Sequence, residues 1–127
     1  MAALELARKG IDVLLTDRSQ FPREKICGDG LLEDSLQILE SIGLSSAVKE
    51  KAHTIRSILF VAPNGTECEL EGDFYTLPRK ELDALLLDEA CKEGAQFLGG
   101  ITVAEPQVQK GSCVGVLGFD EIGRAHV

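Results

Sequence analysis

An acid, several basic side chains and two glycines follow one another in an order that suits a bound dinucleotide. Asp17 ends an apolar run, and an acid at the end of the second strand of a β-α-β unit typically hydrogen-bonds a ribose hydroxyl. The Cys-Gly-Asp-Gly segment at residues 27–30 precedes a helical pattern, and its glycines let the backbone approach a flat ligand or a pyrophosphate. Arg18, Arg23 and Lys25 lie between these features and could balance the charge of a phosphate.

Each of these features also has a simpler structural interpretation, which the sequence leaves open. Asp17 could be an ordinary turn residue after a strand, and Asp29 could cap the helix that follows it. The three basic residues could face solvent without a ligand. The ribose acid of a β-α-β unit lies about 20 residues after a glycine-rich turn, and counting back from Asp17 passes Met1. We therefore expect a fragment that begins inside the first helix, after the first strand and its phosphate loop.

Composition and cysteine spacing argue against several classes of function. The 127 residues carry a net charge of −8, which argues against a nucleic-acid partner, because phosphates attract clustered lysine and arginine. The four cysteines are widely spaced, with no Cys-x-x-Cys pair and no neighbouring histidine, so we expect neither a metal site nor a disulfide framework. Neither a run long enough for a transmembrane segment nor a secretory signal is evident, so the expected location is cytoplasmic.

Apolar periodicity and glycine positions predict an alternating order of helices and strands. The first strand is apolar apart from Asp12, which is typical of a strand covered on both faces of a parallel sheet. The tripeptide Pro63-Asn64-Gly65 separates two β-patterned runs and predicts a hairpin. The predicted helices are 2–9, 31–42 and 79–95, with a helical turn at 45–52, and the predicted strands are 11–15, 55–62, 66–71, 74–77, 96–103 and 113–117.

Two segments of the chain match a recurring pattern. The first reads A-A-x-x-L-A-R-x-G-x-x-V-L-L-x-D-R and continues into F-P-R-x-K-x-C-G-D-G, and the second is Leu-Pro-Arg-Lys-Glu-Leu-Asp at residues 77–83. Together they resemble the geranylgeranyl reductase family of FAD-dependent oxidoreductases, over residues 2–117 in order. The resemblance implies an α/β fold, an FAD-binding Rossmann-like domain of the aromatic-hydroxylase type. This fragment would lack the first strand and include part of a β-rich substrate domain.

The resemblance also implies a cofactor, a substrate and the roles of particular residues. FAD would be the cofactor, with NAD(P)H or another reductant as electron donor, and a double bond of a lipid-like isoprenoid would be reduced. Asp17, with Arg18 beside it, would bind the adenosine ribose, and Arg79 would reach the ribityl-phosphate portion. Val103, at the end of the strand after the long helix, would meet the adenine through backbone groups. The residues implied to line the flavin and its pyrophosphate are Cys27, Gly28, Asp29 and Gly30.

The same resemblance divides the chain into parts. Residues 1–52 would belong to the FAD-binding domain, residues 53–78 would be strands at the edge of the substrate domain, and residues 79–120 would return to the FAD-binding domain. Residues 121–127 depart from the strand pattern before them, and most of this segment matches what a common sequencing adapter encodes. We therefore expect a non-native tail there, with no function for His126.

Two other functions stay open at this stage. An FAD-dependent monooxygenase that hydroxylates an aromatic or polyketide ring would share Asp17, Arg79 and the helix pattern, whereas the segment at 27–30 favours the reductase. A small non-catalytic α/β binding module is the alternative from another class, and a self-contained sheet would distinguish it. No catalytic acid or base is evident, since His53 is expected at the surface, and the fragment itself is expected to be inactive. A lipid substrate is also compatible with peripheral contact with a membrane, and the oligomeric state is not predicted.

Overall fold

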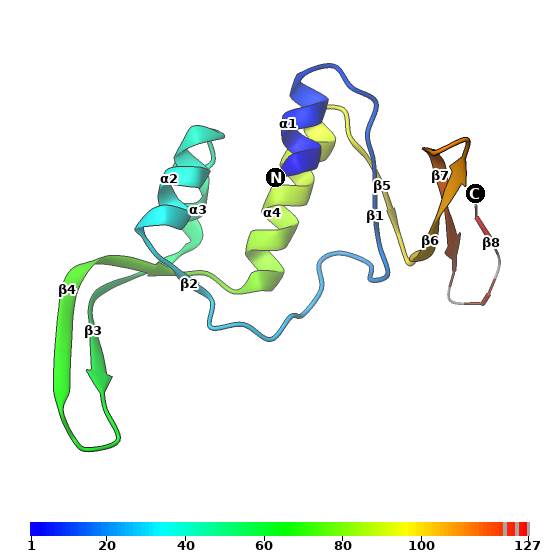
Figure 1. Cartoon of the computed structure of the whole chain (residues 1–127). Helices are drawn as coiled ribbons and strands as arrows, with labels where there is room; N and C mark the ends of the chain where they lie inside the picture. Colours follow the sequence, from blue (N-terminus) through cyan, green and yellow to red (C-terminus); the bar gives the residue numbers. More distant parts are fainter. Residues whose placement is uncertain (121, 124, 127) are drawn as a thin grey trace. The chain divides into compact units, whose positions relative to one another are not determined.

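The computed structural model describes residues 1–120, 122–123 and 125–126 (Figure 1). The chain forms two compact units, one made of Met1–Glu24 with Asp83–Val127 and the other of Lys25–Leu82. The expected non-native tail includes residues 121, 124 and 127, which lie outside the described part, so that expectation stays a prediction. The four-part domain division predicted from the sequence also stays a prediction.

The first unit contains two helix–strand pairs followed by a hairpin. Helix α1 is followed by Gly10 in a left-handed conformation (φ +72°), as the position of this glycine predicts. Strand β1 pairs in parallel with β5, so that Leu14 lies opposite Gln96 and Asp17 lies opposite Gly99. The elements are α1 (Ala2–Arg8), β1 (Leu14–Asp17), most of α4 (Arg79–Lys92), β5 (Gln96–Gly99), β6 (Thr102–Gln109), β7 (Ser112–Phe119) and β8 (Ala125–His126).

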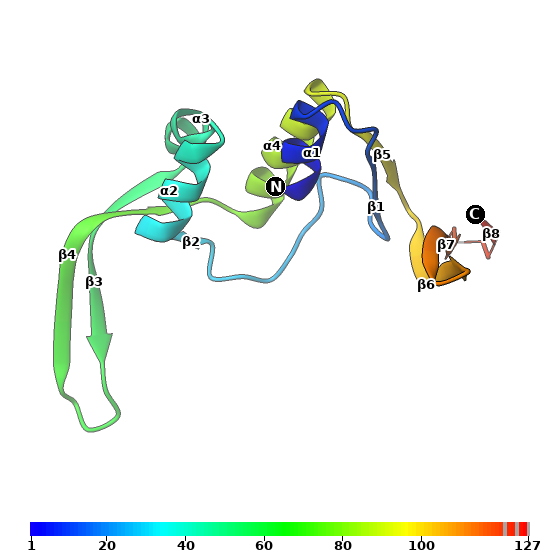
Figure 2. The same cartoon turned by 45° about the horizontal axis from the view of Figure 1, so that its top comes forward.

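Helices α1 and α4 supply most of the buried residues of this unit. They lie side by side in both views (Figures 1 and 2), and Arg8 on α1 donates a hydrogen bond of 3.1 Å to Glu93, just after α4. Leu4 is fully buried. The other buried apolar residues of the unit are Ala3, Ala7, Ala90, Ala95 and Ile101. Most of these buried side chains are small.

The strand predicted over residues 11–15 begins later and is more exposed than expected. Strand β1 starts at Leu14, which is 63% exposed, while Ile11 is 50% exposed and lies outside the strand. Among the described residues, β5 is the strand that pairs with β1. The expectation of a strand covered on both faces is therefore wrong for this chain, because a two-stranded sheet leaves apolar side chains in contact with water.

The single strand predicted over residues 96–103 is wrong, because the chain turns in its middle. Gly100 adopts φ +79°, and the residues on either side of the turn belong to different sheets. Strand β6 instead forms an antiparallel hairpin with β7, closed by Lys110 and Gly111, which both have positive φ. Positive φ at both positions of a two-residue turn is the geometry that matches the twist of a hairpin. The predicted strand at 113–117 lies within β7.

The second unit contains two short helices and a three-stranded antiparallel sheet in the order β2-β4-β3. Helix α2 is shorter at both ends than the predicted helix 31–42, because Gly30 and Leu31 pair with β4 instead. The elements are β2 (Gly30–Leu31), α2 (Glu33–Ser41), α3 (Ser45–Lys51), β3 (His53–Val61) and β4 (Glu67–Thr76). The buried apolar residues are Leu31, Leu36, Leu39, Ile42, Leu44, Val48 and Leu77.

The predicted β3–β4 hairpin is confirmed, and it extends away from α2 and α3 (Figure 2). Gly65 adopts φ +83° in the turn, and the Asn64 side chain accepts a hydrogen bond from the backbone N–H of Thr66 at 3.0 Å. The separate strand predicted over residues 74–77 is wrong, because β4 continues to Thr76. The pairing contains a bulge, in which Gly72 and Asp73 lie opposite Arg56. The bulge accommodates the extra residue, so β4 continues beyond Gly72.

Candidate functional site

Asp17 is held at the carboxyl end of β1 by its backbone and by its side chain. Its carbonyl accepts a hydrogen bond from the N–H of Ile101 at 3.1 Å, between β5 and β6. Its carboxylate Oδ1 accepts a hydrogen bond from the N–H of Ser19 at 2.8 Å, which closes a local turn. The carboxyl ends of parallel strands are where open α/β sheets bind ligands. Asp17 therefore stands where the sequence places it, with its carboxylate oriented by the turn.

Arg23 lies beside Asp17 and makes contacts that the sequence does not indicate. Its Nε is 3.9 Å from Oδ2 of Asp17, and its Nη2 is 3.3 Å from Oδ2 of Asp83 on α4. The guanidinium carbon is 4.9 Å from the centre of the Phe21 ring, and Phe21 packs edge-on against Phe97 of β5. Of the three basic residues proposed to balance phosphate charge, Arg23 is thus an ion-pair partner within the protein, whereas Arg18 and Lys25 are exposed.

Val103 lies on a different strand from the one predicted. The strand that follows α4 ends at Gly99, and Val103 is the second residue of β6, where it pairs with Gly118 of β7. The expected place at the end of the strand after the long helix is therefore wrong, because the turn at Gly100 starts a new strand. Strands β1 and β6 still contact each other, so Asp17 and the strand that carries Val103 belong to the same part of the first unit.

In the second unit, Asp29 connects the loop at residues 27–30 to the start of α4. Asp29 adopts a left-handed backbone conformation (φ 54°), which aspartate tolerates better than most residues. Its carbonyl accepts a hydrogen bond from the N–H of Leu77 at 3.0 Å, and its carboxylate accepts one from the N–H of Arg79 at 3.3 Å. Asp29 therefore caps α4, and the interpretation that it caps the following helix is wrong, because α2 has Leu32 at its N-cap.

Cys27 and Gly28 form the exposed part of this loop. A hydrogen bond from the backbone of Asp29, with a second from the Arg79 side chain, lowers the pKa of the Cys27 thiol below its ordinary value. A Cβ atom added to Gly28 would meet no heavy atom within 4 Å, so the backbone is open to a ligand on that side. The structure thus brings Cys27, Asp29 and Arg79 together from two distant segments.

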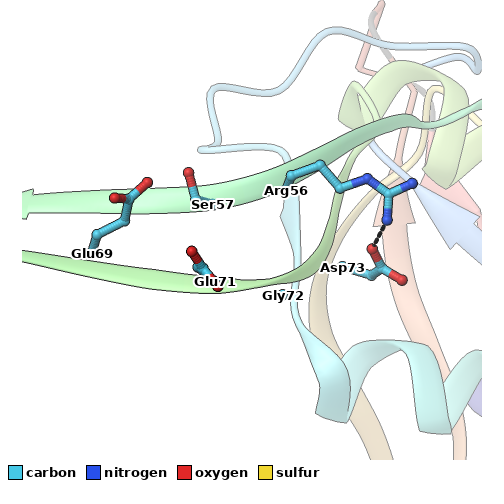
Figure 3. A pocket seen from close by; sticks show the side chains of 6 residues that line it. All are labelled: Arg56, Ser57, Glu69, Glu71, Gly72 and Asp73. Carbon is cyan, nitrogen blue, oxygen red and sulfur yellow. Dashed lines mark hydrogen bonds and ion pairs between the residues drawn. The ribbon is translucent and has the colours of Figure 1, made fainter.

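The β3–β4 hairpin carries an open hollow of about 500 Å³ that contains none of the predicted site residues (Figure 3). Arg56 and Asp73 form an ion pair at one end of it, while Glu69 and Glu71 lie along the strand. The lining residues are Arg56, Ser57, Glu69, Glu71, Gly72 and Asp73. Across the part of the chain that the structure describes, no group of three metal-ligating side chains comes together. No helix within that part is long and apolar enough to cross a membrane.

The residues of each unit fit part of an FAD molecule by the chemistry of their donors and acceptors. The Asp17 side chain is 32% exposed, and its carboxylate retains lone pairs beyond the one that Ser19 uses, so it can accept a ribose hydroxyl. The Arg79 side chain, which a hydrogen bond joins to Cys27, and the N-terminus of α4 supply positive charge suited to a phosphate. Both sets are therefore compatible with the cofactor, each within its own unit.

Comparisons of the sequence with known proteins agree with this chemistry. A family model described as an FAD binding domain matches residues 1–111. Menaquinone reductase of Mycolicibacterium smegmatis is 33% identical over 111 residues, covering 82% of this chain and 27% of that protein. Digeranylgeranylglycerophospholipid reductase 2 of Methanopyrus kandleri is 35% identical over 97 residues, covering 76% of this chain and 24% of that protein. The chain spans about a quarter of the length of these two curated relatives.

The fold is similar to that of solved flavoproteins. The myxobacterial chondrochloren halogenase CndH, an FAD-dependent halogenase, superposes with a TM-score of 0.84 at 24% identity, covering 98% of this chain and 31% of that one. The mixed α/β fold class predicted from the sequence is therefore confirmed, and so is FAD as the cofactor. The chain therefore belongs to the FAD binding domain family.

Proposed function

We propose that this chain is part of the FAD-binding region of an enzyme that reduces the double bonds of an isoprenoid lipid, as in the geranylgeranyl reductase family. The support is that the two curated relatives described above are named as reductases, one of menaquinone and one of a geranylgeranyl lipid. Menaquinone and geranylgeranyl lipids both carry isoprenoid chains. NAD(P)H or another reductant would supply the electrons.

The observation that carries the FAD-binding part of the proposal is the position of Asp17 at the carboxyl end of β1. There its carboxylate accepts a hydrogen bond from the N–H of Ser19, which orients it. Its backbone carbonyl accepts one from the N–H of Ile101, between β5 and β6. We assign Asp17, with Arg18 beside it, to the adenosine ribose of FAD. The backbone of Val103, on the strand that contacts β1, is assigned to the adenine.

The second unit would supply contacts to the other end of the cofactor. We assign Arg79 to the ribityl-phosphate portion, because it opens α4 and carries a positive charge at the helix N-terminus. We assign the loop at residues 27–30 to the flavin and its pyrophosphate. Its residues are Cys27, Gly28, Asp29 and Gly30. Bound FAD supplies two-electron redox chemistry, whereas the protein supplies binding, orientation and charge.

A monooxygenase that acts on an aromatic or polyketide ring is the second candidate. The observation that keeps it open is that Asp17 at the end of β1 and Arg79 at the start of α4 suit the FAD of either class of enzyme. The named reductases among the relatives favour the first candidate. The two differ in product: a reductase adds hydrogen to an alkene without oxygen, whereas a monooxygenase requires oxygen and inserts one of its atoms.

Binding of FAD and FMN to the purified chain tests the cofactor assignment. FMN lacks the adenosine, so the chain should bind FAD more tightly than FMN. Asp17→Asn should weaken FAD binding by about tenfold, the effect of one lost charged hydrogen bond, and leave FMN binding unchanged. Asp12→Asn removes an exposed acid from the same segment and is the matched control. Equal binding of FAD and FMN, or an Asp17→Asn variant that binds like the original chain, would contradict the assignment.

The products tell the two candidate reactions apart. The test uses the longer enzyme to which this FAD-binding part is proposed to belong, because the chain alone is expected to be inactive. That enzyme, loaded with FAD, is chemically reduced without oxygen and mixed with geranylgeraniol, and mass spectrometry follows the addition of hydrogen to its double bonds. A parallel sample receives oxygen and a phenol. Hydrogenated geranylgeraniol supports the reductase, and a hydroxylated phenol without hydrogenated geranylgeraniol supports the monooxygenase.

A further inference from the structure

We propose that Arg23 is a positioning residue that fixes the Asp17 carboxylate for the adenosine ribose without occupying its hydrogen-bond positions. The inference rests on the proposed function, because it assumes that Asp17 binds the ribose. It goes further by assigning a role to a residue that the sequence treats only as a phosphate partner or a solvent-exposed base.

The distances show that Arg23 reaches Asp17 as a charge and not as a hydrogen-bond donor. Its Nε lies 3.9 Å from Oδ2 of Asp17, which is beyond the range of a protein hydrogen bond. The other oxygen, Oδ1, accepts from the N–H of Ser19 at 2.8 Å. The carboxylate is thus oriented by Ser19 on one oxygen and by the charge of Arg23 on the other, and Oδ2 can still accept a ribose hydroxyl.

The other contacts of Arg23 hold its guanidinium in place and keep it from reaching out to a phosphate. Its Nη2 lies 3.3 Å from Oδ2 of Asp83 on α4. The planar group also lies over Phe21, whose ring packs against Phe97 of β5. The Arg23 side chain is only 18% exposed. The guanidinium is therefore tied to the end of β1, to α4 and to β5 within a single unit.

The shape of the side chain explains why arginine suits this position. A guanidinium is planar and presents several donors in a fixed fork, so it can contact two carboxylates while it stacks on a ring. A lysine ammonium is a compact point charge, so it cannot contact both carboxylates and stack on the Phe21 ring as a planar guanidinium does. Loss of the charge would remove the cation between Asp17 and Asp83, and repulsion would then favour other rotamers of the Asp17 side chain.

The test compares the dissociation constants of FAD and FMN for Arg23→Gln, Arg23→Lys, Asp17→Asn and the double variant Asp17→Asn with Arg23→Gln. Arg23→Gln should weaken FAD binding by about tenfold and FMN binding by less than about twofold, because FMN has no adenosine ribose. Arg23→Lys should fall between the original chain and Arg23→Gln. In the Asp17→Asn background, Arg23→Gln should add little, because Arg23 acts through Asp17.

The control variant is Arg8→Gln, which removes another arginine ion pair of the same unit, the one to Glu93. It should leave both dissociation constants unchanged. Three outcomes would overturn the role of Arg23 alone: equal weakening of FAD and FMN, fully additive effects in the double variant, or an Arg23→Gln variant that binds FAD normally. An original chain that does not prefer FAD to FMN would instead contradict the proposed function, and the role of Arg23 toward FAD with it.

Discussion

Two parts of the chain present candidate cofactor contacts, and they are held in place by different interactions. The Asp17 corner, which consists of Asp17, Ser19, Phe21 and Arg23, is braced by side chains through an ion pair and a cation–π contact. The loop at residues 27–30 is held by Asp29, through its carbonyl to Leu77 and its carboxylate to the start of α4. Backbone pairing of Gly30 with β4 and a hydrogen bond between Cys27 and Arg79 add to these contacts.

This difference follows from what each part must offer a ligand. A carboxylate that binds a ribose has to present its oxygens at a fixed angle, which side-chain contacts on several sides can ensure. A loop whose backbone approaches a flat ligand needs a free surface, and the space beside Gly28 is indeed open. The contacts made at Asp29 and Gly30 leave the space beside Gly28 available to a ligand. The following predictions test whether the two parts respond as differently as their contacts indicate.

The largest effect is expected for Leu77→Ala, at the base of the loop. Leu77 is 1% exposed and donates its N–H to Asp29, so truncation leaves a cavity behind the loop. We expect a loss of about 2–5 kcal/mol in the free energy of unfolding, measured by urea titration. Leu59→Ala, at a position that is 56% exposed on β3, is the control and should change stability by less than about 0.5 kcal/mol. Similar losses for both variants would contradict the assignment of Leu77 to the core.

The second prediction concerns the backbone behind the Asp17 corner. A Cβ added at Gly118 would lie 2.7 Å from Cγ2 of Ile101, whose N–H holds the Asp17 carbonyl. Gly118→Ala should therefore destabilise the chain by about 1–3 kcal/mol, as overpacking does. It should also increase hydrogen exchange at the N–H of Ile101. The matched control on the same strand is Gly115→Ala, where a Cβ would meet nothing within 4 Å and exchange at Ile101 should stay unchanged.

The third prediction removes the side chain that joins the loop to the start of α4. Asp29→Ala loses the cap on α4, worth about 1 kcal/mol, and places a Cβ-bearing residue without local hydrogen bonding at φ 54°, which adds about 1 kcal/mol. Asp29→Asn keeps an acceptor and tolerates this backbone conformation, so it should lose less. Thermal unfolding of both variants measures the difference. Equal stability of the alanine variant and the original chain would show that the cap is not significant.

The smallest effect is a difference in thiol reactivity with pH. The hydrogen bonds to Cys27 lower the pKa of its thiol, so its thiolate forms at a lower pH than it otherwise would. Cys27 should therefore react with iodoacetamide faster than exposed Cys68 near neutral pH, and the difference should shrink at high pH, where thiols in general ionise. Peptide mapping by mass spectrometry measures both rates. In Arg79→Gln, the advantage of Cys27 should decrease, and an unchanged rate would contradict the role of Arg79.

The elements that the sequence predicts correctly are those whose signals are local. Helix α4 follows from the apolar spacing of residues 79–95, and the β3–β4 hairpin follows from Asn64 and Gly65. Asp17 at the end of β1 follows from an apolar run that ends on an acid. In each case, neighbouring residues carry enough information, because turns and helical faces depend on short-range contacts.

The predictions from sequence were wrong where pairing between distant residues decides the strand boundaries or the burial of a strand. The run at 96–103 reads as one strand, yet the backbone turns at Gly100 because its second half pairs with β7. Gly72 reads as the end of a strand, yet a bulge opposite Arg56 lets β4 continue. The burial expected for the strand at 11–15 also depended on neighbouring strands, and burial of that kind is not encoded in the run itself.

The sequence by itself determined helix α4, the β3–β4 hairpin and the acid at the end of β1, because these depend on neighbours along the chain. Only the tertiary structure decided that Asp29 caps α4 and that Arg23 lies between Asp17 and Asp83. The physical reason is that a side-chain hydrogen bond or ion pair acts over only a few ångströms. Its partner is therefore set by how distant segments pack together.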